Sequence, residues 1–121
     1  MALPVVEEHV SLKSLNTFGV EARARRLVTL REPEEAAALP GMLAAGDGPP
    51  LVMGGGSNLL FTRDFPGVVI LNRLRGVRVA AADDGHVWVR AAAGEDWDGL
   101  VRHCLAQGWH GLENLVLIPG T

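Results

Sequence analysis

The residues best suited to chemistry form a glycine-rich turn near the middle of the chain. Residues 51–60 read Leu-Val-Met-Gly-Gly-Gly-Ser-Asn-Leu-Leu, so an apolar run leads into three glycines and two polar residues. Glycine permits positive φ angles and lets a ligand approach the backbone closely. Successive backbone N–H groups in such a turn attract anions, and the Ser57 and Asn58 side chains add donors. The pattern indicates a site for a phosphate or pyrophosphate group.

This turn differs from two well-known phosphate-binding motifs. No Gly-Lys-Ser or Gly-Lys-Thr follows the expected strand, as a P-loop requires. The glycines are contiguous and no third glycine opens a long helix, which excludes the usual dinucleotide fingerprint. From spacing alone, a tight glycine turn that binds no ligand stays open as the alternative.

The composition narrows the function classes. The chain has 121 residues, of which 48% are hydrophobic, so a folded domain with a packed core is expected. A formal net charge of −3 gives no basic face for nucleic acid. No apolar run approaches the roughly 20 residues that span a bilayer, and the start lacks the basic segment of a signal peptide. With Cys104 as the single cysteine, we expect a soluble cytoplasmic protein that binds neither nucleic acid nor membrane.

The other reactive side chains form no recognisable site. The histidines lack metal-ligand spacing, so no metal site is expected. Cys104 lies on the apolar face of an expected helix and is interpreted as a small buried hydrophobe. Arg23, Arg25 and Arg26 form a basic cluster, which we interpret as a solvated face, with a phosphate contact as the alternative.

Periodicity and turn residues predict the elements around the glycine turn. Residues 1–10 are predicted to be an irregular lead-in, and residues 33–43 a helix that Pro40 kinks or stops early. Short strands are predicted at 18–22, 27–30, 51–53 and 68–71.

The second half of the chain is predicted to contain a hairpin and one longer helix. The hairpin strands are 77–81 and 86–92, joined by an Asp-Gly turn. Asp96 is the expected N-cap of a helix that Gly108 ends, and residues 113–118 add one more helical turn. A β-α-β unit followed by a hairpin and a helix predicts an α+β fold.

Four blocks of the sequence resemble signature blocks of the MurB family of UDP-N-acetylenolpyruvoylglucosamine reductases. In order along the chain they are Leu15-Asn16-Thr17-Phe18-Gly19-Val20, 54–60, 89–97 and 111–121. Their order and spacing match the family, and the resemblance covers residues 12–121. It makes a glycine turn without a ligand a much weaker alternative.

The resemblance implies an FAD-binding fold of the vanillyl-alcohol oxidase/PCMH type. Residues 1–72 would form its first subdomain and 73–121 the start of an incomplete second one, with the substrate domain absent. In this family NADPH reduces FAD. The flavin then reduces the enolpyruvyl ether of UDP-N-acetylglucosamine to UDP-N-acetylmuramate in peptidoglycan synthesis. The UDP-sugar would bind only to the complete protein, and this chain is expected to be inactive alone.

The resemblance also implies which residues bind the cofactor. One loop would wrap the FAD pyrophosphate, and its residues are Gly54, Gly55, Gly56, Ser57, Asn58 and Leu59. A second loop would contribute Ile118, Gly120 and Thr121. In the first block, Asn16, Thr17 and Phe18 either bind FAD or form a turn that supports the sheet.

The family's catalytic arginine, serine and glutamate have no matching positions in this chain, so no catalytic residue is expected. Arg90, Glu95 and Glu113 are interpreted as surface or structural residues. One alternative is another oxidoreductase with the same FAD fold, although residues 54–60 hold no histidine or cysteine for a covalent flavin link. A module that binds a partner protein is a further alternative. Exposed edges of the expected hairpin strands also predict self-association or marginal stability.

Overall fold

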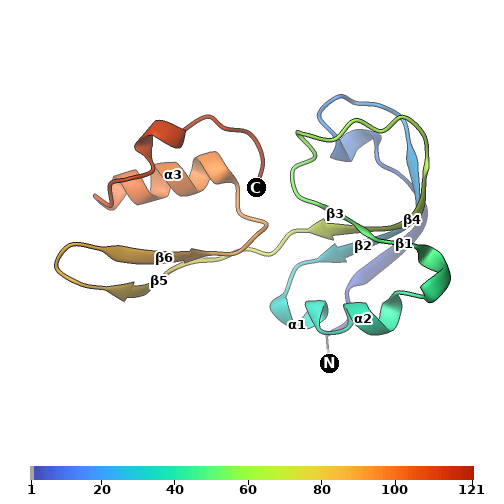
Figure 1. Cartoon of the computed structure of the whole chain (residues 1–121), viewed down its shortest axis with the longest axis horizontal. Helices are drawn as coiled ribbons and strands as arrows, with labels where there is room; N and C mark the ends of the chain where they lie inside the picture. The colour runs from blue at the N-terminus through green and yellow to red at the C-terminus, as the bar shows by residue number, and fades with distance from the viewer. Residues whose placement is uncertain (1) are drawn as a thin grey trace.

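The computed structural model describes residues 2–121 and shows an α+β chain with two sheets (Figure 1). The first unit contains β1 (Val5–Ser11), β2 (Arg23–Leu30), α1 (Pro33–Ala36), α2 (Leu39–Met42), β3 (Leu51–Met53) and β4 (Phe65–Asn72). The second contains β5 (Val77–Ala82), β6 (Val87–Ala91) and α3 (Trp97–Ala106). Single 3-10 turns occur at η1 (Lys13–Leu15), η2 (Ala45–Asp47) and η3 (Glu113–Leu115).

The four-stranded sheet has the strand order β1-β2-β4-β3. β1 runs antiparallel to β2, whereas β2, β4 and β3 are mutually parallel. Residues 27–30 and 68–71 of the two central strands are buried in succession, which is typical of strands covered on both faces. β3 is an edge strand, and the glycine turn leaves its carboxyl end.

Each face of this sheet carries an apolar cluster. On one face, α1 and α2 cover a cluster made of Val28, Leu30, Val68 and Ile70. The other cluster extends to the segments around the glycine turn and consists of Leu12, Ala22, Ala24, Leu27, Met53, Phe61, Val69 and Leu71. Met53 belongs to the second cluster, so the residue directly before the first glycine is anchored in the core.

Two predicted elements of this unit are wrong. Residues 5–10 are not irregular, because they belong to β1, which pairs with β2, but the β1 side chains are mostly exposed and leave no apolar pattern. Residues 18–22 form no strand; a turn with Gly19 at φ 66° leads into β2, which starts only at Arg23. The predicted interruption of the helix over 33–43 is confirmed, because α1 and α2 are separate turns and Pro40 has no N–H to continue the first one.

Glu35 caps α1 from inside the helix. Its carboxylate accepts hydrogen bonds from the Arg31 N–H at 2.6 Å and the Glu32 N–H at 3.1 Å. These two backbone donors are the main reason that the pKa of Glu35 lies below its ordinary value. The charged form therefore closes the turn that leads from β2 into α1.

We expect Glu35→Gln to reduce the dependence of stability on pH in the acidic range. The folded-state pKa is lowered, so the carboxylate stabilises the fold above its unfolded-state pKa. That contribution is lost as the pH falls through the folded-state value. Thermal unfolding followed by circular dichroism at stepwise lower pH would measure it. Glu34→Gln, at the exposed neighbouring position, is the matched control, and equal pH profiles for both variants would contradict the expectation.

In the second unit, the hairpin turn and both ends of α3 form where the local sequence predicts them. The Asp83 carboxylate accepts hydrogen bonds from the N–H groups of Gly85 and His86 and closes the hairpin turn. The Asp96 carboxylate accepts from the Gly99 N–H at 2.7 Å and caps α3, and Gly108 ends that helix at φ 75°. Cys104 is 2% exposed, which confirms its interpretation as a buried hydrophobe.

None of the helices within residues 2–121 has the length and apolar character that crossing a bilayer requires.

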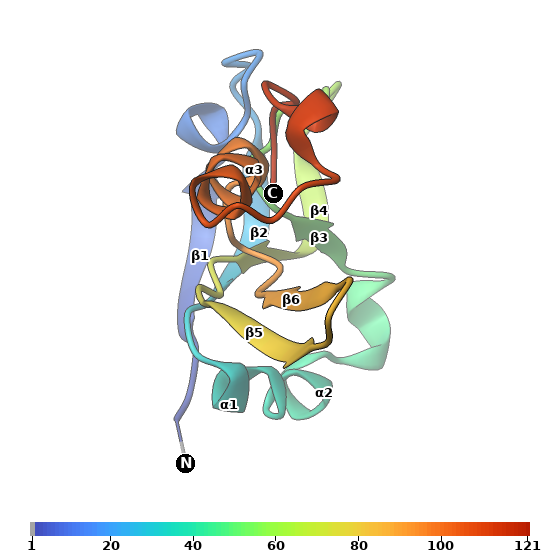
Figure 2. The ribbon, with the colours of Figure 1, turned by 90° about the vertical axis from the view of Figure 1, so that its left-hand side faces the viewer.

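The chain's C-terminal end lies between the two units (Figure 1). Seen from the side of the hairpin, β5 and β6 lie in front with α3 above them (Figure 2). Gly94 packs against the Leu74 backbone where the units are joined, and a Cβ on Gly94 would overlap it. The two units therefore meet at this joint and at the C-terminal segment.

Candidate functional site

The glycine turn and the C-terminal segment together line a cavity of about 340 Å³. Its walls are Val52, Met53, Gly54, Gly55, Gly56, Ser57, Asn58, Leu59, Pro119, Gly120 and Thr121. Eight of the nine residues expected in the two cofactor loops thus surround one space, although more than sixty positions separate Gly54 from Thr121 in the sequence. Ile118 is not among the lining residues and is 48% exposed.

Close packing explains why glycine occupies this turn. A Cβ on Gly56 would overlap the Leu15 carbonyl oxygen, and one on Gly54 would overlap the Thr121 hydroxyl. A Cβ on Gly55 would lie 3.4 Å from the Gly120 Cα. Among these three glycines only Gly56 has a positive φ, at 70°. The absent side chains mainly make room for two neighbouring segments of the protein.

The turn offers unpaired donors. Within residues 2–121, the backbone N–H groups of Gly55, Gly56, Ser57 and Asn58 have no protein acceptor. In the same part of the chain, the side chains of Ser57 and Asn58 also make no hydrogen bond. No lysine or arginine lines the cavity. Because unpaired donors need acceptors, the donor set fits the oxygen atoms of a phosphate group held by neutral dipoles.

Asn16 and Thr17 of the first resemblance block support the glycine turn. The Asn16 side-chain amide donates to the carbonyls of Leu12 and Val20 at 2.7 and 3.1 Å, and its oxygen accepts from the Val20 N–H. The Thr17 N–H donates to the Gly56 carbonyl at 3.1 Å. Asn16 is buried, and neither residue lines the cavity. These bonds hold the segment against which Gly56 packs.

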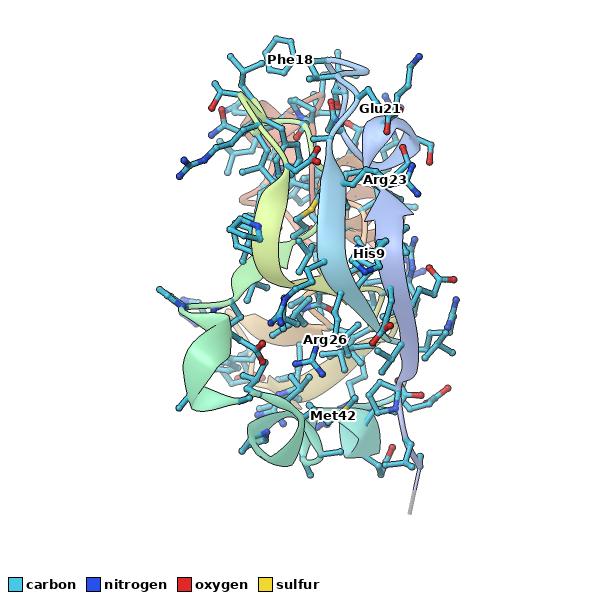
Figure 3. The ribbon with its side chains drawn as sticks, turned by 90° about the vertical axis from the view of Figure 1, so that its right-hand side faces the viewer. His9, Phe18, Glu21, Arg23, Arg26 and Met42 are labelled. Atoms are coloured by element: carbon cyan, nitrogen blue, oxygen red, sulfur yellow. The ribbon has the colours of Figure 1, made fainter. Side chains whose placement is uncertain are left out.

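Phe18 lies apart from the cavity. Its side chain is 64% exposed, and Figure 3 shows it at the outer end of the sheet. The structure therefore separates the three residues of the first block, since Asn16 and Thr17 brace the glycine turn and Phe18 does not.

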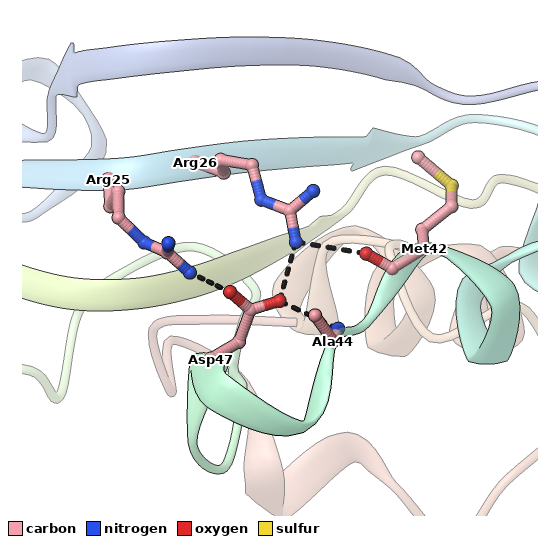
Figure 4. Close-up of polar contacts among 5 residues, drawn as sticks. All are labelled: Arg25, Arg26, Met42, Ala44 and Asp47. Atoms are coloured by element: carbon pink, nitrogen blue, oxygen red, sulfur yellow. Dashed lines mark hydrogen bonds and ion pairs between the residues drawn. The ribbon is translucent and has the colours of Figure 1, made fainter.

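The arginines of the basic cluster make specific polar contacts within the chain. Arg25 and Arg26 both form ion pairs with the largely buried carboxylate of Asp47, as Figure 4 shows. Arg26 also donates to the Met42 carbonyl at 2.9 Å, and Arg23 donates to the His9 carbonyl. Interpreting the cluster as a solvated face is therefore wrong for Arg26, which ties β2 to the segment after α2. With both guanidinium groups engaged by Asp47, a phosphate contact is also disfavoured.

A larger cavity of about 470 Å³ lies beside the glycine turn. It is lined by residues 47–49, 51 and 59–67, and it shares only Leu59 with the expected cofactor loops. Size alone does not make it the site, because the unpaired backbone donors belong to the smaller cavity.

Comparison with known proteins identifies the family of this chain. The model of a family described as "FAD binding domain" matches residues 24–121, which is most of the chain. The chain belongs to this FAD-binding domain family. The expected α+β FAD-binding fold is thereby confirmed, and FAD is the cofactor of the family.

Two curated relatives are reductases. UDP-N-acetylenolpyruvoylglucosamine reductases of Burkholderia multivorans and Burkholderia cenocepacia are each 45% identical to this chain over 120 residues, which is 99% of the chain and 34% of each relative. The crystal structure of MurB from Thermus caldophilus matches with a TM-score of 0.66 and 34% identity. That match covers 98% of this chain and 40% of the other. The resemblance to MurB is confirmed, and the chain spans about a third of the length of its curated relatives.

Sequence reasoning missed two residues that shape the site. Trp97 and Asp98, at the start of α3, bond to the segment that carries Gly120 and Thr121. Trp97 lies inside the resemblance block 89–97, but nothing in that block indicates its contacts with Leu115 and Gly120. No local pattern indicates the contact of Asp98 with Leu117, because the two residues lie 19 positions apart.

Proposed function

We propose that this chain binds the pyrophosphate of FAD with the turn formed by Gly54, Gly55, Gly56, Ser57, Asn58 and Leu59. Gly120 and Thr121 close the same site from the second unit. Four successive unpaired N–H groups beside a cavity between the two units are the observation that carries this proposal. Unpaired donors beside a cavity without lysine or arginine fit a phosphate group held by neutral dipoles, so the residues present fit the cofactor.

The remaining candidate cofactor-binding residues have lesser roles in this proposal. Ile118 leads into the second loop, and its exposed side chain is available to the cofactor. Asn16 and Thr17 support the turn through backbone contacts. Phe18 is proposed as a cofactor-facing residue only in a longer protein, because in this chain its ring is exposed and lies away from the cavity.

We further propose that the chain is the cofactor-binding part of an NADPH-dependent reductase. The names of the relatives support conversion of the UDP-N-acetylglucosamine enolpyruvyl ether to UDP-N-acetylmuramate in peptidoglycan synthesis. FAD supplies the hydride-transfer chemistry when bound, and this chain's residues bind and orient it. We also propose that the catalytic groups and the UDP-sugar site lie outside this chain, which covers 34% of the Burkholderia multivorans relative, and that the chain alone is inactive.

The proposed organisation has two FAD-binding subdomains, 1–72 and 73–121, in a cytoplasmic protein. The separate sheets of the two segments support this division.

β5 and β6 pair only with each other in the described part of the chain, so each has a free edge that invites self-association. Sedimentation velocity over a concentration series tests that association, and a single monomer at all concentrations would contradict it.

Titration with flavins tests the binding proposal. We expect FAD to bind at least about ten-fold more tightly than FMN, since FMN lacks the pyrophosphate and adenylate that the turn would engage. Riboflavin, without any phosphate, is expected to bind most weakly. Quenching of flavin fluorescence measures all three affinities. Equal affinities for the three flavins, or no binding of FAD, would contradict the proposal.

A further inference from the structure

Three hydrogen bonds tie the C-terminal segment to the first turn of α3. The Trp97 backbone N–H donates to the Gly120 carbonyl at 3.0 Å, and the Trp97 indole Nε1 donates to the Leu115 carbonyl at 2.9 Å. The Leu117 N–H donates to Asp98 Oδ1 at 2.6 Å. Trp97 is the first residue of α3, so its backbone N–H has no acceptor within the helix. Two consecutive residues therefore hold the whole segment 115–120.

Leu117 has a backbone conformation that leucine seldom adopts. Its φ is 66°, in the left-handed region where the Cβ crowds the following carbonyl oxygen. Such a residue keeps this conformation only where its surroundings impose it. Packing does not impose it, because the Leu117 side chain is 73% exposed. The hydrogen bond from its own N–H to Asp98 fixes the direction of the Leu117 peptide group, between the two Trp97 contacts at Leu115 and Gly120.

Asp98 is itself held in place. Its second oxygen, Oδ2, accepts from Arg102 Nε at 2.7 Å, one helical turn further along α3. Arg102 first, and the Leu117 N–H second, hold the pKa of the Asp98 carboxyl below its ordinary value. The acceptor is thus charged at neutral pH, and a hydrogen bond to a charged acceptor is stronger than one between neutral groups.

The path of this segment decides the shape of the cavity. Only Ile118 and Pro119 separate Leu117 from Gly120, whose Cα lies 3.4 Å from a Cβ built on Gly55. Thr121 packs so closely on Gly54 that no side chain fits there. A change of backbone direction at Leu117 would move both residues relative to the glycine turn.

We propose that Asp98 is a positioning residue for FAD. By holding Leu117 in the left-handed conformation, it places Gly120 and Thr121 against the glycine turn at the spacing that the pyrophosphate needs. The inference rests on the proposed function and assigns to Asp98 a role beyond the loops that contact the cofactor.

FAD titration of four variants of this chain tests the proposal. Asp98→Ala is expected to weaken FAD binding about ten-fold, the effect of losing one charged hydrogen bond. Asp98→Asn keeps an oxygen acceptor for Leu117 and is expected to stay within about three-fold of the wild type. Arg102→Gln removes the ion pair but leaves the acceptor, with the same small effect expected. Asp84→Ala, at the exposed hairpin turn, is the control. Wild-type affinity in Asp98→Ala, or equal losses in Asp98→Ala and Arg102→Gln, would overturn the proposal.

Leu117→Gly separates positioning from a general structural role. Glycine adopts the left-handed conformation without strain, so Asp98→Ala should cost much less FAD affinity in this background than in the wild type. Additive losses would count against the proposed constraint. Amide hydrogen exchange without FAD is an independent measurement, in which Asp98→Ala should expose the Leu117 N–H. If the wild type fails to bind FAD, the proposed function fails, while unchanged exchange at Leu117 overturns the positioning role alone.

Discussion

Gly56→Ala is expected to lower the free energy of unfolding by about 3 kcal/mol and to abolish measurable FAD binding. The new methyl group would stand at a φ of 70° and overlap the Leu15 carbonyl oxygen. Because that oxygen belongs to backbone held by Asn16, it cannot move away without breaking buried hydrogen bonds. Chemical denaturation and FAD titration measure the two effects.

Gly46→Ala is the matched control for this substitution. Gly46 is exposed, has no positive φ, and a Cβ there would meet no atom within 4 Å. We expect its stability to change by less than about 0.5 kcal/mol and its FAD affinity to equal that of the wild type. Similar losses in both variants would show that the chain tolerates no alanine in its glycine-rich segments, and would remove the special role of Gly56.

Asn16→Ala is the second large effect that we expect, with a loss of about 3 kcal/mol of stability. The substitution leaves the carbonyls of Leu12 and Val20 and the Val20 N–H without their side-chain partner in a partly buried turn. FAD affinity should also fall, by about ten-fold, because the adjacent Thr17 N–H holds the Gly56 carbonyl. Thermal unfolding and flavin titration measure these changes.

Asn16→Asp distinguishes support from direct cofactor contact. Aspartate keeps the oxygen that accepts from Val20 but loses the two N–H donors, so its stability should fall nearly as far as that of Asn16→Ala. Asn114→Ala, at an exposed position without a side-chain hydrogen bond in the described part of the chain, should behave like the wild type. A loss of FAD affinity without any loss of stability in Asn16→Ala would instead make Asn16 a direct ligand.

Much of the second unit could be predicted because its determinants are local. The Asp83 carboxylate closes the hairpin turn by accepting from N–H groups two and three positions further along. The Asp96 carboxylate caps α3 by accepting from an N–H three positions further along. Gly108 ends the same helix in the conformation that glycine favours. Neighbours in the sequence make each of these contacts, so residue type and spacing are enough to indicate them.

The first unit was less predictable, since its elements depend on distant partners. β1 is a strand because β2 pairs with it, and its exposed side chains carry no apolar alternation. The buried carboxylate of Asp47 draws Arg25 and Arg26 from β2, a contact across more than twenty positions. Neither partner indicates the other in the sequence.

For the candidate site, the sequence by itself determined the chemistry: a turn rich in backbone donors, without charge, in a chain that resembles FAD-binding reductases. Only the tertiary structure decided how that turn is used. The fold packs Leu15 against Gly56 and Thr121 against Gly54, so the glycines mainly allow these segments to approach the turn closely. It also brings Asp98 to Leu117 and so directs the second loop to the first. Local backbone preferences are carried by residue type, whereas the meeting of segments far apart in the chain requires the folded core that holds them.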